Sequence, residues 1–381
     1  MFLNSFNFML PKSFSINWLI LLFSLLLSSV GCLFLYSAAG GAYDPWSKTQ
    51  MLRYLVGVCV FIYVSSVNIR LWISLSYFIY FISLLLLVLV YLFGDVGMGA
   101  QRWLDLGFMR IQPSELVKFS LILLIARYYY TEKEYTPAMK FISICLVVFF
   151  IFLPACLIYT QPDLGGAIIL VLLGITLLFV IGLSIWFFVI SGLLIVFASP
   201  IVWNYLLHDY QKSRILTFLD PSKDPLGTGY HIIQSKIALG SGGLWGRGFM
   251  KGSQSQLNFL PEMQTDFIFT LIAEEFGMMG SVILLLVYLL LIVYSFIIGW
   301  ISKNAFGSYL AMGISIILFY SVFINVSMVM GLLPVVGVPL PLISYGGSSM
   351  LTTMFGLGLV SCVYVHRNDD IEKYKPGLLG W

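Results

Sequence analysis

A carboxylate stands where a polar stretch of the chain gives way to an apolar one. The polar stretch ends in LPEMQTD at 260–266, and an apolar run over 267–272 follows it. Thr265 or Asp266 could cap the N-terminus of a helix that begins here. Asp266 could instead act as a general base, because partial burial raises the pKa of a carboxyl group and makes it a better proton acceptor. The residues alone leave both roles open.

A second pair of ionisable residues lies inside an apolar segment. Glu115 and Lys118 are three residues apart, so on a helix they share one face. Ionisable groups at membrane depth are costly and mark candidate functional sites. The pair could simply neutralise itself near a helix end. It could also line a polar cavity and contact an anionic substrate or a catalytic acid.

Two glycine-rich segments carry further candidates. The segment 94–114 contains Trp103, which could anchor the chain at a membrane interface or floor a pocket by stacking on a sugar or packing on a lipid tail. The segment 234–249 has five glycines, whose backbone could present N–H groups to phosphate oxygens. It lacks the GxxxxGK[ST] pattern of a phosphate-binding loop, and a flexible connector is the alternative.

The elements that hold these residues must lie in a membrane. The chain is 60% hydrophobic and 10% charged, with a mean hydropathy of +0.97, whereas a soluble domain is about 25% charged. The net charge of +3 comes without a clustered basic face, so we expect no nucleic-acid partner. The cysteines and histidines show no metal-ligand spacing.

The apolar runs predict an all-α polytopic membrane protein. A span needs about 20 mainly apolar residues. We predict about ten transmembrane helices, over 17–39, 50–67, 71–93, 115–130, 140–159, 164–182, 185–207, 278–300, 308–330 and 350–366. They form a single transmembrane domain over 1–367, followed by a tail over 368–381.

The distribution of Lys and Arg predicts the orientation, because cytoplasmic loops carry the excess. With the termini inside, the short inner segments hold nine such residues and the short outer segments four. We therefore expect both termini in the cytoplasm. The segment 208–265 is then one large extracytoplasmic loop between spans 7 and 8, and its aromatic and turn residues indicate an ordered structure.

The last outer segment, 331–349, cannot form a regular span. It contains Pro334, Pro339 and Pro341 and several glycines. Irregular backbone at membrane depth persists only where it is buried in protein or lines a cavity. This segment is therefore predicted to form a wall of the same polar chamber.

Several ordered motifs resemble the SEDS family (shape, elongation, division and sporulation). They are QPSELVK at 112–118, QPDLG at 161–165, the stretch 220–248, LPEMQTDFIF at 260–269, AEEFG at 273–277 and GVPLPLISYGGSS at 337–349. The resemblance covers nearly the whole chain to Arg367. The run GYHIIQSKIALGSGG at 229–243, followed by SQSQLNFLPE at 253–262, is similar to the elongation branch.

The resemblance implies an activity and partners. Family members polymerise lipid II into peptidoglycan strands outside the bacterial cytoplasmic (inner) membrane. They work with a class B penicillin-binding protein, and the elongation branch with further membrane proteins of the elongation complex. The family's essential loop aspartate falls on Asp266, its outer-loop tryptophan on Trp103, and its acid and lysine of span 4 on Glu115 and Lys118.

These assignments give a hypothetical inverting mechanism in which Asp266 is the general base. Candidate contacts to the substrate pyrophosphate are Arg102, Lys236, Arg247 and Lys251. A divalent cation, Mg²⁺ or Mn²⁺, could assist through the substrate's own phosphates, since no dedicated protein cage is visible. The rival functions are a lipid II flippase and a non-enzymatic scaffold for the penicillin-binding protein. A flippase should show paired broken helices near the midplane, whereas a scaffold should tolerate Asp266→Asn.

Overall fold

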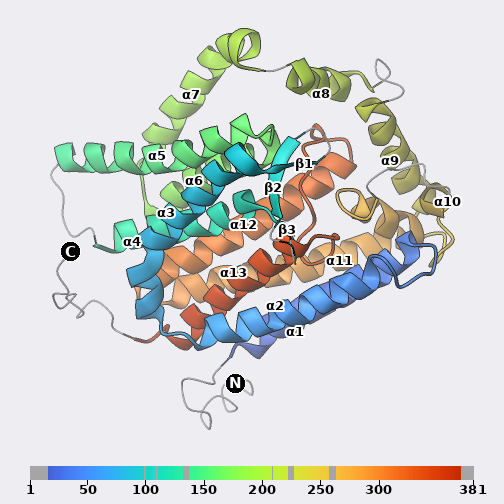
Figure 1. Ribbon diagram of the computed structural model, residues 1–381, viewed down its shortest axis with the longest axis horizontal. Helices are drawn as coiled ribbons and strands as arrows, with labels where there is room; N and C mark the ends of the chain where they lie inside the picture. Colours follow the sequence, from blue (N-terminus) through green and yellow to red (C-terminus); the bar gives the residue numbers. More distant parts are fainter. Residues whose placement is uncertain are drawn as a thin grey trace.

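The computed structural model is built almost entirely from helices (Figure 1). It describes residues 16–97, 100–105, 107, 110–131, 137–207, 209–221, 227–256 and 263–369. Ten long helices lie in this part of the chain: α1 (Trp18–Ala38), α2 (Ser47–Ser66), α3 (Ile69–Phe93), α4 (Pro113–Thr131), α5 (Pro137–Thr160), α6 (Leu164–Ile181), α7 (Ile185–Ile201), α11 (Ile268–Ile301), α12 (Ala305–Val329) and α13 (Gly347–Val365).

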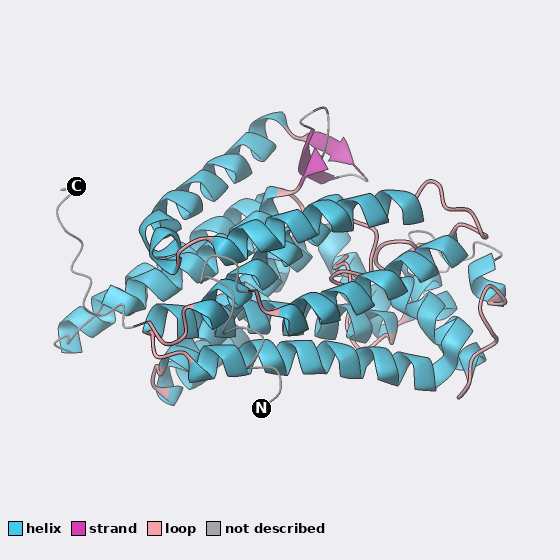
Figure 2. Ribbon diagram, turned by 90° about the horizontal axis from the view of Figure 1, so that it is seen from below, coloured by secondary structure: helices cyan, strands magenta, loops and turns pink. Residues whose placement is uncertain are grey.

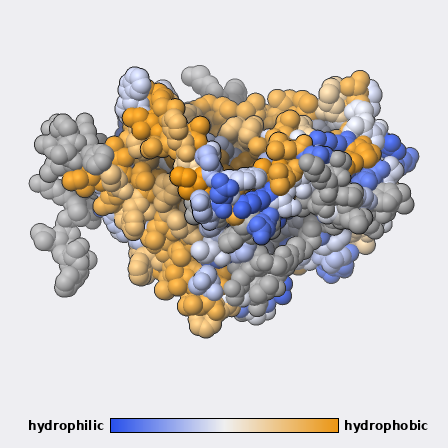
Figure 3. Space-filling model, turned by 90° about the horizontal axis from the view of Figure 1, so that it is seen from above, coloured by the Kyte–Doolittle hydropathy of each residue, from blue (hydrophilic) through white to orange (hydrophobic). Residues whose placement is uncertain are grey.

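Most of these helices suit a bilayer. Within the described residues, nine helices are long and apolar enough to cross a membrane. The tenth long helix, α4, carries Glu115, Lys118 and Arg127. Figure 3 shows apolar residues over much of one face, with hydrophilic residues gathered in a limited area. The all-α membrane architecture is thus confirmed, and the number of spans stays a prediction.

Helix α12 forms the centre of the bundle. It packs against α4, α6, α11 and α13, and 83% of its most apolar window is buried, compared with none of that of α7. In Figure 1, α7 accordingly stands away from the other helices. A π-helical turn, Val202–Leu206, continues it. Side chains that must keep a fixed position are therefore best placed on α12 and the elements that contact it.

Three short strands interrupt the helices between α3 and α4. They are β1 (Asp95–Gly97), β2 (Ala100–Asp105) and β3 (Arg110–Ile111), and they form an antiparallel sheet in the order β1-β2-β3. Figure 2 shows them together at the edge of the helical body. Strand β2 contacts α3 and α4, so it lies beside the helix that carries Glu115.

The segment predicted as a large loop contains helices of its own. These are α8 (Asp209–Leu219), α9 (Thr228–Gly242) and the short α10 (Ser253–Gln256). Helix α9 packs against α11. Residues 208, 222–226 and 257–262 of the predicted loop, and 370–381 of the predicted tail, lie outside the described residues.

Helix α11 begins earlier than the predicted span over 278–300. It starts at Ile268 and runs for 34 residues, with a break at Gly277, where φ is 67°. An added Cβ at Gly277 would lie 2.3 Å from the backbone nitrogen of Gly246. The amides of Met278 and Met279 donate to the carbonyls of Gly243 and Leu244, at 2.9 and 3.1 Å. At the break, hydrogen bonds within the helix are therefore replaced by hydrogen bonds to residues 243–248, the glycine-rich turn.

Candidate functional site

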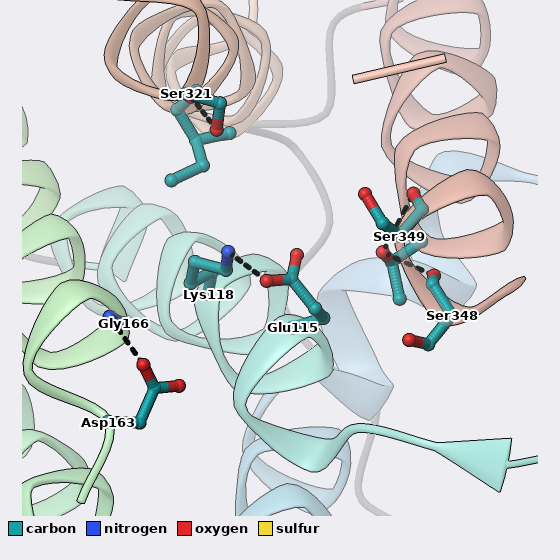
Figure 4. Close-up of polar contacts among 9 residues, drawn as sticks. Glu115, Lys118, Asp163, Gly166, Ser321, Ser348 and Ser349 are labelled. Atoms are coloured by element: carbon teal, nitrogen blue, oxygen red, sulfur yellow. Dashed lines mark hydrogen bonds and ion pairs between the residues drawn. The ribbon is translucent and has the colours of Figure 1, made fainter. Parts of the chain in front are cut away.

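The predicted ionisable pair is formed in the structure. Lys118 Nζ lies 2.6 Å from Glu115 Oε1, and the two side chains are 4% and 15% exposed. Both come from the N-terminal half of α4, where spacing of three residues places them on one face, as predicted. Figure 4 shows the pair between α12, which carries Ser321, and the start of α13, which carries Ser348 and Ser349.

The pair lines a cavity between α4, α12, α13 and the irregular segment before α13. The cavity encloses about 340 Å³ of empty space, including the part open to solvent, and its lining residues are Glu115, Lys118, Phe119, Ile317, Leu318, Ser321, Val338, Pro339, Pro341, Ser349 and Thr353. The irregular segment thus forms a wall of this cavity, as its prolines predicted. The hydroxyl groups of Ser321, Ser349 and Thr353 also line the cavity, and no sequence pattern had indicated them.

Asp266 borders the same wall. It lies in a turn before α11 and is half-buried. A Cβ added at Gly337 would stand 3.3 Å from Asp266 Oδ2, and Val338 and Pro339, the next two residues, line the cavity. The segment 337–341 therefore has the Asp266 carboxylate at its start and the Glu115–Lys118 cavity along its length.

Neither Thr265 nor Asp266 is the N-cap residue of α11, as one alternative had predicted. The N-cap is Phe267, whose side chain makes no capping hydrogen bond. The turn is instead held through its backbone by residues distant in sequence. Asn325 and Ser344 donate to the carbonyls of Asp266 and Thr265. Neither residue was among the candidates predicted from the sequence. An asparagine within an apolar span was the signal that could have identified Asn325.

Arg102 and Trp103 lie together on β2, and both are half-buried. Arg102 Nη2 donates to the carbonyl of Pro162, so it ties the sheet to the turn before α6. Asp163 in that turn caps α6 by accepting from the amide of Gly166, at 3.1 Å. Contact of Arg102 and Trp103 with a substrate stays a prediction.

The amides of the glycine-rich turn do not face an open phosphate site. Gly246, Arg247 and Gly248 donate their N–H groups to the carbonyls of Gly242, Glu274 and Glu275, at 2.8, 3.0 and 3.0 Å. The predicted presentation of these amides to phosphate is therefore wrong. The physical reason is the break in α11. The carbonyls of Glu274 and Glu275 beside the break accept hydrogen bonds from the turn.

The remaining basic candidates lie apart from the cavity. Arg247 donates to Ser241 O at 3.2 Å and to Ser253 Oγ at 3.1 Å. Lys236, on α9, extends over Gly331, and Lys251 is exposed. Among the described residues, the cavity lining includes neither these three nor Arg102. Their role as pyrophosphate contacts stays a prediction.

Metal ligation by the chain itself has little support in the described part. No three His, Cys, Asp or Glu residues there lie close enough to hold one ion. A cation that accompanies the substrate phosphates stays a prediction.

Comparison with known proteins identifies the family. The family model of the cell cycle proteins FtsW, RodA and SpoVE matches residues 17–369. The chain is 44% identical to the peptidoglycan glycosyltransferase MrdB of Escherichia coli K12, over 92% of this chain and 93% of that protein. This chain belongs to the SEDS family.

Solved SEDS structures share the fold. A chain from a peptidoglycan synthase complex that coordinates polymerization and crosslinking matches with a TM-score of 0.79 and 33% identity, over 93% of this chain and 99% of that one. The rod shape determining protein RodA of Thermus thermophilus matches with a TM-score of 0.71 and 28% identity, over 94% and 100%. The predicted family is confirmed, and likeness to RodA and MrdB agrees with its elongation branch.

Proposed function

We propose that this SEDS protein is a peptidoglycan glycosyltransferase that polymerises lipid II into glycan strands during cell elongation. The observation that carries the proposal is the shared wall: segment 337–341 has Asp266 at its start and the Glu115–Lys118 cavity along its length. The E. coli relative named as such an enzyme covers nearly the whole chain.

The reaction assigns one proton transfer to Asp266. The 4-hydroxyl of the acceptor sugar attacks the anomeric carbon of the donor, and polyprenyl pyrophosphate leaves with the electron pair of the broken bond. An α-linked donor that gives a β-linked product has been inverted, so a single base on the acceptor side suffices. The Asp266 carboxylate takes the proton of the attacking hydroxyl, a role worth typically 10²–10⁴-fold in rate.

The buried ion pair sets the charge of the chamber. Lys118 is almost inaccessible to water and lies against one oxygen of Glu115. Charges in such a low-dielectric site act more strongly than in water. Lys118 would stabilise negative charge on the leaving phosphate, and Glu115 would hold the ammonium group in place until substrate arrives.

Further substrate contacts complete the proposed site. Trp103 and Arg102 on β2 would contact the substrate near the start of α4, while Lys236, Arg247 and Lys251 would meet the pyrophosphate from the side of α9. Mg²⁺ or Mn²⁺ would bind the substrate phosphates and offset the charge of the leaving group.

The proposed setting is the bacterial cytoplasmic membrane, with both termini in the cytoplasm and the cavity toward the outer side. The partner is a class B penicillin-binding protein, which crosslinks the strands. Support comes from the similar chain in a synthase complex that couples polymerization to crosslinking.

The test is polymerisation of labelled lipid II by detergent-purified protein, alone and with its class B penicillin-binding protein, with and without divalent cations. Glycan ladders are expected from the wild type. Absence of ladders under every condition, together with lipid II scrambling in liposomes, would favour the flippase. Absence of both activities would favour the scaffold.

A further inference from the structure

The turn that carries Asp266 is held through three consecutive backbone carbonyls. Gln264 O accepts from the amide of Tyr345 at 2.8 Å, Thr265 O from Ser344 Oγ at 2.5 Å, and Asp266 O from Asn325 Nδ2 at 2.9 Å. Each donor lies at least 59 residues away along the chain. The position of this turn is therefore tied to elements that are distant in sequence.

Asn325 makes a double connection that few side chains could replace. Its amide nitrogen donates both to Asp266 O and to Val338 O, the latter at 2.7 Å. A carboxamide has two N–H donors, so both are used. Asn325 is fully buried, at 0% exposure, on the central helix α12. One side chain thus ties the Asp266 turn directly to the cavity wall.

The other two donors stand on a segment that is itself braced. Ser344 is buried, its Oγ accepts from Leu340 N at 2.8 Å, and its carbonyl accepts from Gln50 Nε2 at 2.9 Å. The guanidinium of Arg53 lies 4.4 Å from the centre of the Tyr345 ring. Helix α2 therefore supports Ser344 and Tyr345. We call the three donors Asn325, Ser344 and Tyr345 the clamp; it is held by α12 and α2.

We propose that Asn325 and Ser344 are positioning residues for the reaction, which hold the Asp266 turn in register with the wall at 337–341. The inference rests on the proposed role of Asp266 as the base. A base must lie within hydrogen-bonding reach of the proton that it takes. Misplacement of a reacting group by about 1 Å can cost about 100-fold in rate, so loss of the clamp acts on turnover before it acts on substrate binding.

The test compares matched asparagine substitutions at the two ends of α12. Asn325→Asp keeps the shape but loses the two N–H donors and places a carboxylate near two carbonyl oxygens. Asn304→Asp makes the same chemical change at the N-cap, where only Oδ1 is used, to accept from the amide of Phe306 at 3.1 Å. An aspartate keeps that acceptor, so the control should retain activity and stability.

The expected result is a split between kcat and KM. Asn325→Asp should lower kcat at least ~10-fold with KM for lipid II within about two-fold of wild type. Ser344→Ala removes the donor to Thr265 O and the acceptor of Leu340 N with a minimal change of volume. We expect a smaller drop in kcat, again with KM unchanged. Asn325→Gln, which restores the amide on a longer side chain, should recover part of the loss.

Three outcomes would overturn the inference. They are a folded Asn325→Asp with wild-type kcat, a rise in KM at unchanged kcat, or losses that follow only the fraction of unfolded protein. If Asn325→Asp does not fold, Ser344→Ala decides by the same split. Asp266→Asn is measured alongside: if it polymerises at the wild-type rate, the base assignment fails as well, whereas an inactive Asp266→Asn beside fully active clamp variants removes the clamp alone.

Discussion

Two acidic regions flank the start of α11, and they are built in opposite ways. Glu274 and Glu275 are each 1% exposed, and their carboxylates accept from the segment 250–254 and from α1: Glu274 from Gln254 N at 2.8 Å, Glu275 from Ser37 Oγ and the amide of Met250. Asp266 is half-buried and is held through its backbone carbonyl.

The proposed base is thus the least buried of these three acids, and it differs from the glutamates in which of its atoms are held. In the glutamate pair the side chains hold the segment 250–254 and α1 in place, which is an architectural arrangement. In the Asp266 turn the backbone is fixed by other residues, and the carboxylate lies beside the cavity wall. The comparison predicts that substitutions at Asp266 affect turnover, whereas substitutions at the glutamates affect stability.

The largest effect is expected for Asp266→Asn. The amide keeps the size and the backbone contacts but cannot accept a proton, so polymerisation should fall by roughly 1,000-fold. The melting temperature should remain that of the wild type. Glycan ladder formation and thermal unfolding of the purified protein measure the two effects. Asp209→Asn, an exposed change at the start of α8, is the control.

The next-largest loss of activity is expected at the Glu115–Lys118 ion pair. Lys118→Met removes the cation and leaves the Glu115 carboxylate in a nearly closed site, so we expect about a 100-fold loss of polymerisation and a lower melting temperature. The double variant Glu115→Gln/Lys118→Met removes both charges. It should regain stability without regaining activity. Recovery of activity in the double variant would mean that the pair serves only to balance its own charge.

Glu275→Gln should have the opposite effects to those expected of Asp266→Asn, lowering stability and not turnover. The substitution weakens hydrogen bonds to a buried carboxylate, which costs about 1–3 kcal/mol of stability. Turnover per folded molecule should stay near that of the wild type. Thermal unfolding measures the loss of stability. A polymerisation assay at reduced temperature, where the variant stays folded, measures turnover separately. A stable but inactive Glu275→Gln would break the comparison, because it would give the architectural acid a catalytic role.

The smallest effect is expected at an acid outside both regions. The amide of Gly107 and the side chain of Arg110 lower the pKa of Asp105, which lies exposed on β2. A lowered folded-state pKa stabilises the protein above the unfolded pKa, and this stabilisation is lost as the pH falls through the folded value. Since solvent screens an exposed pair, Asp105→Asn should lower the melting temperature only slightly at neutral pH and leave the activity unchanged. Melting temperatures of the wild type and of Asp105→Asn, measured over a series of pH values, test this expectation.

Local patterns in the sequence account for much of the fold and part of the site. The apolar runs correctly located ten long helices. The three-residue spacing of Glu115 and Lys118 placed both on one face, and the prolines of 331–349 marked the irregular wall.

What failed depends on contacts between distant segments. The use of the glycine-rich amides follows from the pairing of 243–248 with the break at Gly277. No periodicity encodes that pairing. Likewise, the clamp joins Asn325 to Asp266 across 59 residues, and only the packed helices bring them together.

The central claim is tested most directly by measuring the polymerisation rate and the melting temperature of Asp266→Asn and Glu275→Gln in parallel, with the class B penicillin-binding protein present. The account predicts a stable, inactive Asp266→Asn beside a destabilised Glu275→Gln that polymerises lipid II when folded. A stable Asp266→Asn that polymerises at the wild-type rate would contradict it.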